Sequence, residues 1–426
     1  MEWGRHARSA DRLGILRSDY MLHDDDGDEG HKLKQVELNT IAEGVGGELA
    51  HFLGENERAV KTTTNDATTT MGTGVRKGVP ESPAMTRLPR AMAVAYDRYR
   101  SRFPPTADAG DDDDDGGGGG PIVLFVVQPG ETNTVDQRML EVALWENHGI
   151  PVVRASLAEV HDGMTLDEST GRLTFVEGAD AVSDATAREV AVVYFRAGYA
   201  PTDYPSGDRG SEWLVREMLE RGRATKCPNL GYHLTGTKKV QQELARAGAV
   251  ERFFPDDGDG DEAATARLIR SAFTGLYSLG ADADADDMRA VRDVLLQGGE
   301  GRYVLKPQRE GGGYNFYGED MAQKLRENCS ISDDGEVSLG PALSEFILME
   351  RLFPPQQRAI LMRNGRMEGV GMTISKLGCF GVIVASGDGV IVHNEYAGFL
   401  LRTKFSGVDE GGVASGFAAL SSPYLC

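Results

Sequence analysis

The chain has 426 residues, 40% hydrophobic and 26% charged, which is enough for about two or three globular domains. Acidic residues outnumber basic ones by 66 to 45, and the net charge of -21 excludes a general positive field for binding nucleic acid or an anionic membrane. The cysteines form no CxxC pair, which argues against a zinc site or a disulfide framework. They are Cys227, Cys329, Cys379 and Cys426.

The sequence shows no evident membrane span or targeting signal. The longest strongly apolar run, residues 122–127, is too short to cross a bilayer. The opening stretch MEWGRHARSADRLG has no apolar signal core. We therefore expect a soluble, cytosolic protein, with an organellar address left open if the natural start lies upstream.

Several tracts are rich in Asp, Gly or Thr and hold too few apolar residues to build a core, so we expect solvated inserts. Alternate Asp residues resemble a calcium-binding loop, but no tract has the Gly and Glu spacing of an EF-hand, which favours disordered loops. The tracts are residues 23–31, 61–74, 108–120, 256–262 and 281–287.

The first candidate site lies in LKQVELNTIAEGVGG, which begins at Leu33. Apolar residues alternate along this stretch, so a strand would turn Glu37 and Asn39 together to its other face. A carboxylate beside an amide supplies hard oxygen ligands suited to Mg²⁺. The alternative is a solvent-facing edge strand.

Strands and helices alternate between about residues 122 and 235, which predicts a parallel sheet covered by helices. PIVLFVVQPG reads as a buried strand, and TVDQRMLEVALWENHG as an amphipathic helix closed by Gly149. Polar side chains follow the strand ends, where ligands of open α/β sheets bind. These side chains are Glu131, Asn133, Gln137, Arg196 and Tyr199.

The stretch RYVLKPQREGGGYNFYGED runs from Arg302 to Asp320. A short strand delivers Lys306 to a loop of glycines at 311–313, whose backbone N–H groups can approach an anion closely. Glu310 would repel phosphates unless a divalent cation lay between them, so the set indicates Mg-nucleotide. It does not match a P-loop, and a flexible turn is the alternative.

The last part of the chain reads as strands joined by tight turns, which predicts a mainly antiparallel sheet with few helices. LLRTK places Arg402 and Lys404 on one strand face, and DEGGVASG follows as a second loop of small residues. A solvated strand edge and a hairpin are the alternative.

The order of these motifs resembles the eukaryotic glutathione synthetase family of ATP-grasp ligases. The resemblance covers nearly the whole chain apart from the acidic tracts. The matching blocks are RSDYM from Arg17, KQVELNTI from Lys34, DQR from Asp136, VAVVYFRAGY from Val190, KCPNLGYHLTGTKKVQQEL from Lys226, VLKPQREGGGYNFYGEDM from Val304, FILMERL from Phe346, LGCFGVIV from Leu377, and GFLLRTK with DEGGVASG from Gly398.

The resemblance implies a mixed α/β protein with an ATP-grasp fold and an inserted parallel-sheet, substrate-binding domain. The implied domains are residues 1–118, an incomplete N-terminal part of the core, 119–236, the inserted domain, and 237–426, the ATP-grasp domain with its glycine-rich lid loops. It also implies a reaction in which ATP, γ-glutamylcysteine and glycine give glutathione, ADP and phosphate through an acyl phosphate. Both glycine loops would exclude water from that intermediate. A homodimer is the expected assembly.

The resemblance also implies residue roles. The implied magnesium ligands are Glu37, Asn39 and Glu310. The implied nucleotide contacts are Lys238, Lys306, Gly311, Gly312, Gly313, Asn315, Tyr317, Met349, Glu350, Arg351, Leu352, Lys376 and Lys404. The implied substrate contacts are Arg17, Glu131, Asn133, Gln137, Arg196, Tyr199, Arg402, Val413 and Ala414. Of these, Arg17, Lys306 and Arg402 would act on the reacting groups.

The chain departs from the family pattern in several places. Lys376 in ISKLG stands where the family has an acidic residue, and Ala42 and Gly44 replace two serines. The helical region that precedes RSDYM in the family is missing, so we expect an incomplete chain. These departures leave two alternatives: a ligase for another small amine such as β-alanine, and a catalytically silent nucleotide-binding homologue.

Overall fold

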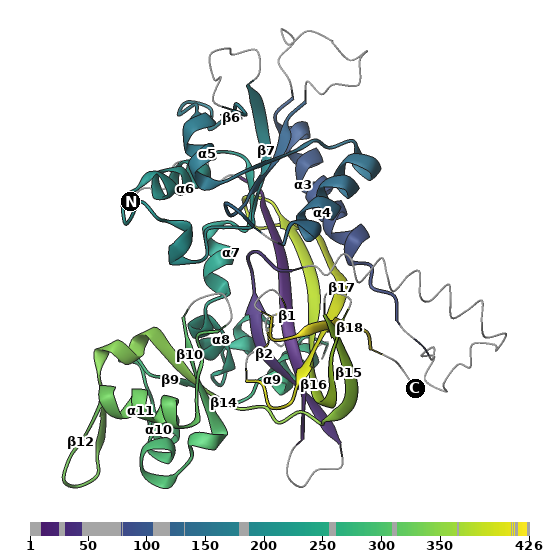
Figure 1. The fold of residues 1–426 in the computed structure, drawn as a ribbon. Helices are drawn as coiled ribbons and strands as arrows, with labels where there is room; N and C mark the ends of the chain where they lie inside the picture. The colour runs from purple at the N-terminus through teal and green to yellow at the C-terminus, as the bar shows by residue number, and fades with distance from the viewer. Residues whose placement is uncertain are drawn as a thin grey trace, which may run out of the picture.

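The computed structural model shows a long twisted sheet with helices around its upper part and a smaller body beside its lower part (Figure 1). This mixed α/β architecture agrees with the predicted fold class. The structure describes residues 10–24, 30–44, 78, 80–104, 120–131, 133–178, 187–254, 261–308, 313–363, 366–409, 411, 413 and 416–423.

The large sheet joins strands from both ends of the chain. Its strands are β1 (Arg12–Asp24), β2 (His31–Asn39), β3 (Ile122–Val126), β4 (Val152–Ala155), β5 (Met164–Leu166), β6 (Leu173–Phe175), β7 (Arg188–Phe195), β8 (Thr225–Cys227), β15 (Gln357–Arg363), β16 (Arg366–Ala385), β17 (Ile391–Phe405) and β18 (Ala419–Ser421). Over the described residues the order is β18-β17-β16-β1-β8-β7-β3-β4, with β2 beside β1, β15 beside β16, and β5 and β6 beside β7.

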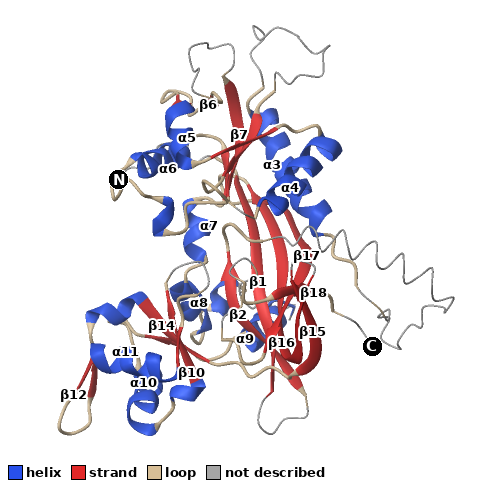
Figure 2. Ribbon diagram, viewed as in Figure 1, coloured by secondary structure: helices blue, strands red, loops and turns tan. Residues whose placement is uncertain are grey.

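The upper part of this sheet is parallel, which confirms the prediction from strand and helix alternation. β3, β4, β7 and β8 all pair in parallel, and β3 is buried along its whole length. Val123 and Phe125 pack on the side of α3 (Ala84–Arg102) and α4 (Thr134–His148). Leu124 and its neighbours pack on the side of α5 (Leu157–Gly163) and α6 (Ser211–Arg221), and Figure 2 shows α5 and α6 to the left of β7 and α3 and α4 to its right. Burial on both faces explains the continuous apolar run.

The parallel strands do not form a separate sheet. β8 pairs in parallel with β1, where Arg12 lies opposite Lys226. The sheet therefore runs across both predicted domain limits, at residues 119 and 236, and the division into three domains stays a prediction.

The antiparallel part of the sheet sets the register of the site. Asp19 on β1 lies opposite Glu37 on β2 and opposite Gly378 on β16. Lys376 on β16 lies opposite Arg402 on β17. Side chains from four strands thus meet at one level of the sheet.

The smaller body contains a second sheet of order β11-β10-β14-β9 and several helices. Leu305 and Leu348 of this sheet share a core with Val291 and Leu325 of its helices. α7 (Leu230–Thr235) leads toward this body, and α9 (Asp261–Ala272) lies beside β2 of the large sheet (Figure 1). The other elements of this part of the chain are α8 (Lys238–Ala245), β9 (Leu276–Ser278), α10 (Ala285–Gln297), β10 (Tyr303–Pro307), β11 (Phe316–Tyr317), α11 (Gly318–Asn328) and β14 (Phe346–Glu350), with β12 (Cys329–Ile331) and β13 (Val337–Leu339) paired in a sheet of their own.

The prediction of a disordered tract at residues 281–287 is wrong, because part of this tract begins a helix. Asp284 caps α10: its side chain accepts hydrogen bonds from the backbone N–H groups of Asp286, at 2.9 Å, and Asp287, at 3.0 Å. The side chain of Asp287 accepts from the N–H of Asp284 in return, at 2.9 Å. Aspartates suit this position because they satisfy the open N–H groups of a first turn. The tract at residues 61–74 lies outside the described residues.

Candidate active site

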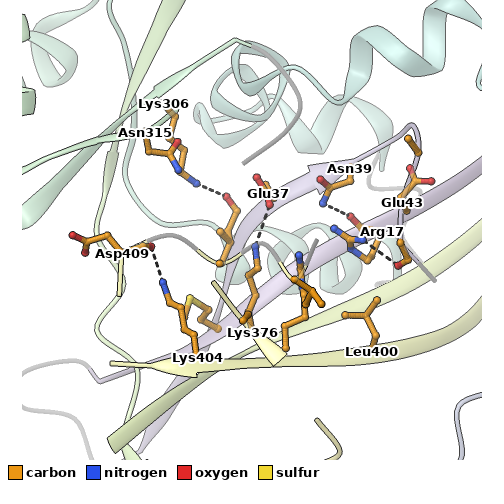
Figure 3. Close-up of a pocket in the computed structure, with 18 of the residues that line it drawn as sticks. Arg17, Glu37, Asn39, Glu43, Lys306, Asn315, Lys376, Leu400, Lys404 and Asp409 are labelled. Carbon is orange, nitrogen blue, oxygen red and sulfur yellow. Dashed lines mark hydrogen bonds and ion pairs between the residues drawn. The ribbon is translucent and has the colours of Figure 1, made fainter. Parts of the chain in front are cut away.

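A cavity of about 890 Å³ lies between the small sheet and the large one. Its volume is in the range of small-molecule sites. Most of the described residues that the sequence predicted for the site line it, as Figure 3 shows for those it labels. They are Arg17, Glu37, Asn39, Glu131, Asn133, Arg196, Tyr199, Lys238, Lys306, Asn315, Tyr317, Met349, Glu350, Arg351, Leu352, Lys376, Arg402, Lys404 and Val413.

Some predicted residues do not line the cavity. Gln137 is fully buried and its side-chain oxygen accepts a hydrogen bond from Arg154 at 3.2 Å, so it supports the cavity from behind. Its helix turns it inward, which the spacing of the motif does not reveal. Gly313 has a φ of 92° and is absent from the lining. The predicted residues Glu310, Gly311, Gly312 and Ala414 lie outside the described residues.

Glu37 on β2 is held by two lysines. Lys376 Nζ donates to Glu37 Oε1 at 3.2 Å, and Lys238 Nζ lies 3.2 Å from Glu37 Oε2. Burial alone would raise the pKa of this carboxyl, but Lys376 and Lys238 outweigh burial and hold the pKa well below its usual range. Glu37 is therefore an anion at neutral pH.

Asn39 is oriented by the neighbouring strand. Its side-chain N–H₂ group donates to the backbone oxygen of Arg17 at 3.2 Å and to Asp19 Oδ2 at 3.3 Å. The amide oxygen is thereby turned away from these acceptors, which leaves it able to bind a cation together with Glu37. Within the described ranges no group of three or more His, Cys, Asp and Glu side chains could hold a metal ion, and the third predicted ligand, Glu310, lies outside them.

Asp19 is the centre of the ionic network, and the sequence analysis missed it. It is fully buried, with Arg17 Nε at 2.8 Å from Oδ1, Lys376 Nζ at 3.4 Å from Oδ2, and Arg402 also hydrogen-bonded to Oδ2. Burial raises the pKa of this carboxyl, yet the cations prevail and the pKa is lowered. Its alternation with Arg17 along β1 was a signal that both share one face.

Lys306 and Lys238 approach Glu37 from the smaller body. Lys306 on β10 is buried and donates to the backbone oxygen of Val36 at 3.0 Å. Burial lowers the pKa of Lys306 to about 8. Lys238 is the first residue of α8 and is also buried. Two buried ammonium groups at one end of the cavity are suited to a polyanion such as a triphosphate.

Another part of the cavity wall is formed by Arg351, which follows β14, and by Lys404 on β17. Arg351 donates to Asp409 Oδ1 at 2.9 Å and lies 5.2 Å from the ring of Tyr317, while Lys404 Nζ donates to the backbone oxygen of Asp409 at 2.6 Å. These contacts join the small sheet to the residues after β17.

The carboxylate of Glu350 is hydrogen-bonded to neighbouring residues of the protein. It accepts from Thr274 Oγ1 at 3.0 Å, from the backbone N–H of Gly275 at 2.8 Å and from Tyr277 Oη at 3.0 Å. This side chain therefore shapes the wall of the cavity from within the fold.

The far end of the cavity carries the two arginines Arg17 and Arg196. Arg196 donates to the backbone oxygen of Glu43 at 2.6 Å, and Arg17 donates to that of Gly44 at 3.3 Å. Nearby, Gln128 donates to Tyr199 Oη at 3.3 Å. Guanidinium groups held in this way are suited to the carboxylates of a small substrate.

Glu43 is a second residue that the sequence analysis missed. It is 3% exposed, lines the cavity, and its Oε1 has no hydrogen-bond partner within the described residues. Burial raises the pKa of this carboxyl to about 7, against the opposing effect of Arg17 and Arg196. The preceding residue, Ala42, has a φ of 56°, a left-handed conformation that is uncommon for alanine. The sequence offered no periodic signal for a buried glutamate in this turn.

The substitution Glu43→Gln is expected to stabilise the protein at alkaline pH. The folded-state pKa of about 7 lies above the ordinary glutamate value of 4.5, so the wild type loses stability as the pH rises through that interval. Glutamine carries no charge to bury, so the variant should gain up to about 3 kcal/mol at about pH 8 and little at about pH 4. Urea unfolding at both pH values measures this, and an equal gain at both would contradict the assigned pKa.

The large sheet, the smaller body and the polar cavity between them define a mixed α/β protein with a site for a small molecule. A solved structure of a glutathione synthetase-like effector from Globodera pallida, in its apo form, has a similar fold, with a TM-score of 0.66 and 21% identity. The similarity covers 98% of this chain and 78% of that one.

The family model for "Eukaryotic glutathione synthase, ATP binding domain" matches residues 4–425. Glutathione synthetase of Xenopus laevis is 39% identical over 424 residues, covering 97% of this chain and 74% of that protein. Glutathione synthetase of Homo sapiens is 36% identical over 414 residues, with the same coverages of 97% and 74%. The chain therefore belongs to the eukaryotic glutathione synthase family, a family of ATP-dependent ligases.

The plant relatives are longer. Chloroplastic glutathione synthetase of Arabidopsis thaliana is 37% identical over 421 residues, which are 99% of this chain and 66% of that protein. That of Solanum lycopersicum is 38% identical, and the match covers 64% of its length. The chain thus spans about two thirds of the length of these relatives.

Proposed function

We propose that the protein is a glutathione synthetase, which joins the cysteinyl carboxylate of γ-glutamylcysteine to the amine of glycine and cleaves ATP to ADP and phosphate. One observation carries this proposal: a single cavity holds buried lysines for a triphosphate at one end and buried arginines for carboxylates at the other, and Glu37 lines it next to the buried Asp19. The names of the relatives supply the substrates.

The chemistry needs no protein nucleophile. A carboxylate oxygen of the dipeptide attacks the γ-phosphorus, the bond from that phosphorus to the β-γ bridging oxygen breaks, and ADP leaves. The glycine nitrogen then attacks the acyl carbon, and phosphate leaves with the acyl oxygen as the amide forms. Lys238 and Lys306 would stabilise the charge on the transferring group, and Arg402 that on the substrate carbonyl.

Mg²⁺, when bound, would neutralise charge on the phosphate oxygens. The ionised Glu37 and the oriented amide oxygen of Asn39 fit such an ion, because both are hard oxygen donors on the same face of β2. These two residues would hold the metal, with Glu310 as the third predicted ligand.

The first test is ADP release by purified protein with Mg-ATP, γ-glutamylcysteine and glycine, omitting each in turn, with the product identified by mass spectrometry. Glutathione that requires all three is the expected result. A product formed with β-alanine in preference to glycine would indicate the ligase for another amine. ATP binding without any product would indicate a silent homologue.

The assembly and the location in the cell stay predictions. The family resemblance leads us to expect a homodimer, which sedimentation of the purified chain would measure. No helix in the described part of the chain is long and apolar enough to cross a membrane. We propose a cytosolic location, although relatives include chloroplastic forms, and imaging of a tagged full-length protein would test it.

A further inference from the structure

Lys376 lies between two carboxylates at the centre of the cavity. Its Nζ is 3.2 Å from Glu37 Oε1 and 3.4 Å from Asp19 Oδ2, and its side chain is 16% exposed. Figure 3 shows the side chain reaching up from β16 to Glu37 on β2. The carboxylates come from adjacent strands, because Asp19 and Glu37 face each other in the pairing of β1 with β2.

The amino group therefore occupies the position of a bound cation. Both oxygens of Glu37 have an ammonium partner, Lys376 on one and Lys238 on the other. A divalent ion that bound Glu37 through Oε1 would compete directly with Lys376. Because the ion and the ammonium group are both positive, they would also repel each other at that distance.

The wider surroundings are positive as well. Two carboxylates, Asp19 and Glu37, face a larger number of cationic groups, and Asp19 is fully buried. A free divalent ion would gain little from entering such a site, whereas an ion that arrives with a polyanion brings its own negative charge. The cationic groups are Arg17, Lys238, Lys306, Lys376 and Arg402.

We propose that Lys376 is the internal counter-cation of the metal site: it neutralises Glu37 and Asp19 in the free protein, opposes binding of a free divalent ion, and is displaced when metal enters with the nucleotide. This role rests on the proposed function, since that function supplies the metal and the nucleotide. Lys376 is then a positioning residue that couples metal binding to nucleotide binding.

The test measures Mn²⁺ binding to the nucleotide-free protein, with free Mn²⁺ followed by electron paramagnetic resonance. Lys376→Met removes the competing ammonium group and should lower the Kd for Mn²⁺ by about 10- to 100-fold, the range for one charge-assisted contact. Lys324→Met is the matched control, because it removes one positive charge on α11, where Lys324 lies over the rings of Phe316 and Phe346. Its Kd should equal that of the wild type.

Lys376→Gln keeps an N–H donor for Glu37 without the charge, and it gives a second reading if the methionine variant does not fold. Thermal melting identifies which variant is folded. Equal or weaker Mn²⁺ binding by the folded variant, or no binding by either protein, would overturn the proposal. The Mn²⁺ assay needs no turnover. If Lys376→Met binds Mn²⁺ more tightly than the wild type while the wild type forms no glutathione, the ligase function would be rejected and the role of Lys376 supported.

Discussion

Replacing Lys306 with methionine is expected to lower turnover by about 10²- to 10³-fold, the usual cost of removing one preorganised electrostatic contact. Lys306 is buried, faces Glu37 across the cavity, and has a backbone carbonyl, that of Val36, as its hydrogen-bond acceptor. Burial already lowers the pKa of this lysine to about 8, which means that the fold tolerates its charge at a cost. Methionine has a similar length and no charge, so the variant should be at least as stable. Steady-state kinetics and thermal melting measure both effects.

Lys226 supplies a matched control for this experiment. It is also buried, donates to a backbone carbonyl, that of Gly222, at 2.8 Å, and has a pKa lowered by burial to about 8. It does not line the cavity. Lys226→Met should therefore change stability in the same direction and leave turnover near the wild-type value. An equal loss of turnover in both variants would show that Lys306 acts through the fold and not on the substrate.

The titration of Lys306 adds an expected pH dependence. Its ammonium form predominates below about pH 8, so kcat/KM for ATP should fall as the pH rises through that value. The folded-state pKa is below the ordinary lysine value of 10.5, so this group has the opposite effect on stability: the free energy of unfolding should rise between about pH 8 and pH 10.5. In Lys306→Met both dependences should weaken.

The second large effect is expected for Glu37→Gln, which should reduce kcat by about 10²-fold or more and weaken the response to Mg²⁺. The substitution removes a predicted metal ligand and leaves Lys238 and Lys376 without the carboxylate that positions both. Lys238 is buried, so the loss of its carboxylate partner Glu37 should also cost stability, by about 1–3 kcal/mol. Initial rates over a series of Mg²⁺ concentrations, together with urea unfolding, measure these effects.

Glu395→Gln controls for the loss of a paired carboxylate in general. Glu395 lies on β17 outside the cavity, and it pairs with Arg90 at 2.5 Å and with His393 at 3.0 Å. We expect a change in stability without a change in Mg²⁺ dependence. Normal turnover of Glu37→Gln at limiting Mg²⁺ would remove Glu37 from the predicted ligands.

Local patterns in the sequence were enough to predict much of the fold. The apolar run of β3, the helix α4 with Gly149 at its end, and the short strand that carries Lys306 are all present as predicted. The alternation of apolar residues along β2 predicted that Glu37 and Asn39 share one face of the strand, and both side chains line the cavity. These features depend on residues close together in the chain, so short-range periodicity reveals them.

Charge-rich segments were harder to interpret. Aspartates near residue 284 suggested a solvated insert, yet Asp284 and Asp287 form the cap of α10. The same residue type serves an exposed loop and a helix start, and the outcome depends on whether the following turns bury an apolar face, here through Val291 and Val294. Composition alone cannot separate these cases.

The sequence by itself determined the parallel and antiparallel strand patterns, the order of the motifs and, through them, the family. The tertiary structure alone decided that Asp19 lies at the centre of the site, that Glu43 is a buried acid, and that Lys376 binds the carboxylates of Asp19 and Glu37. The reason is physical: these contacts depend on strand pairing between residues far apart in the chain, and the pKa shifts depend on burial by those same distant neighbours.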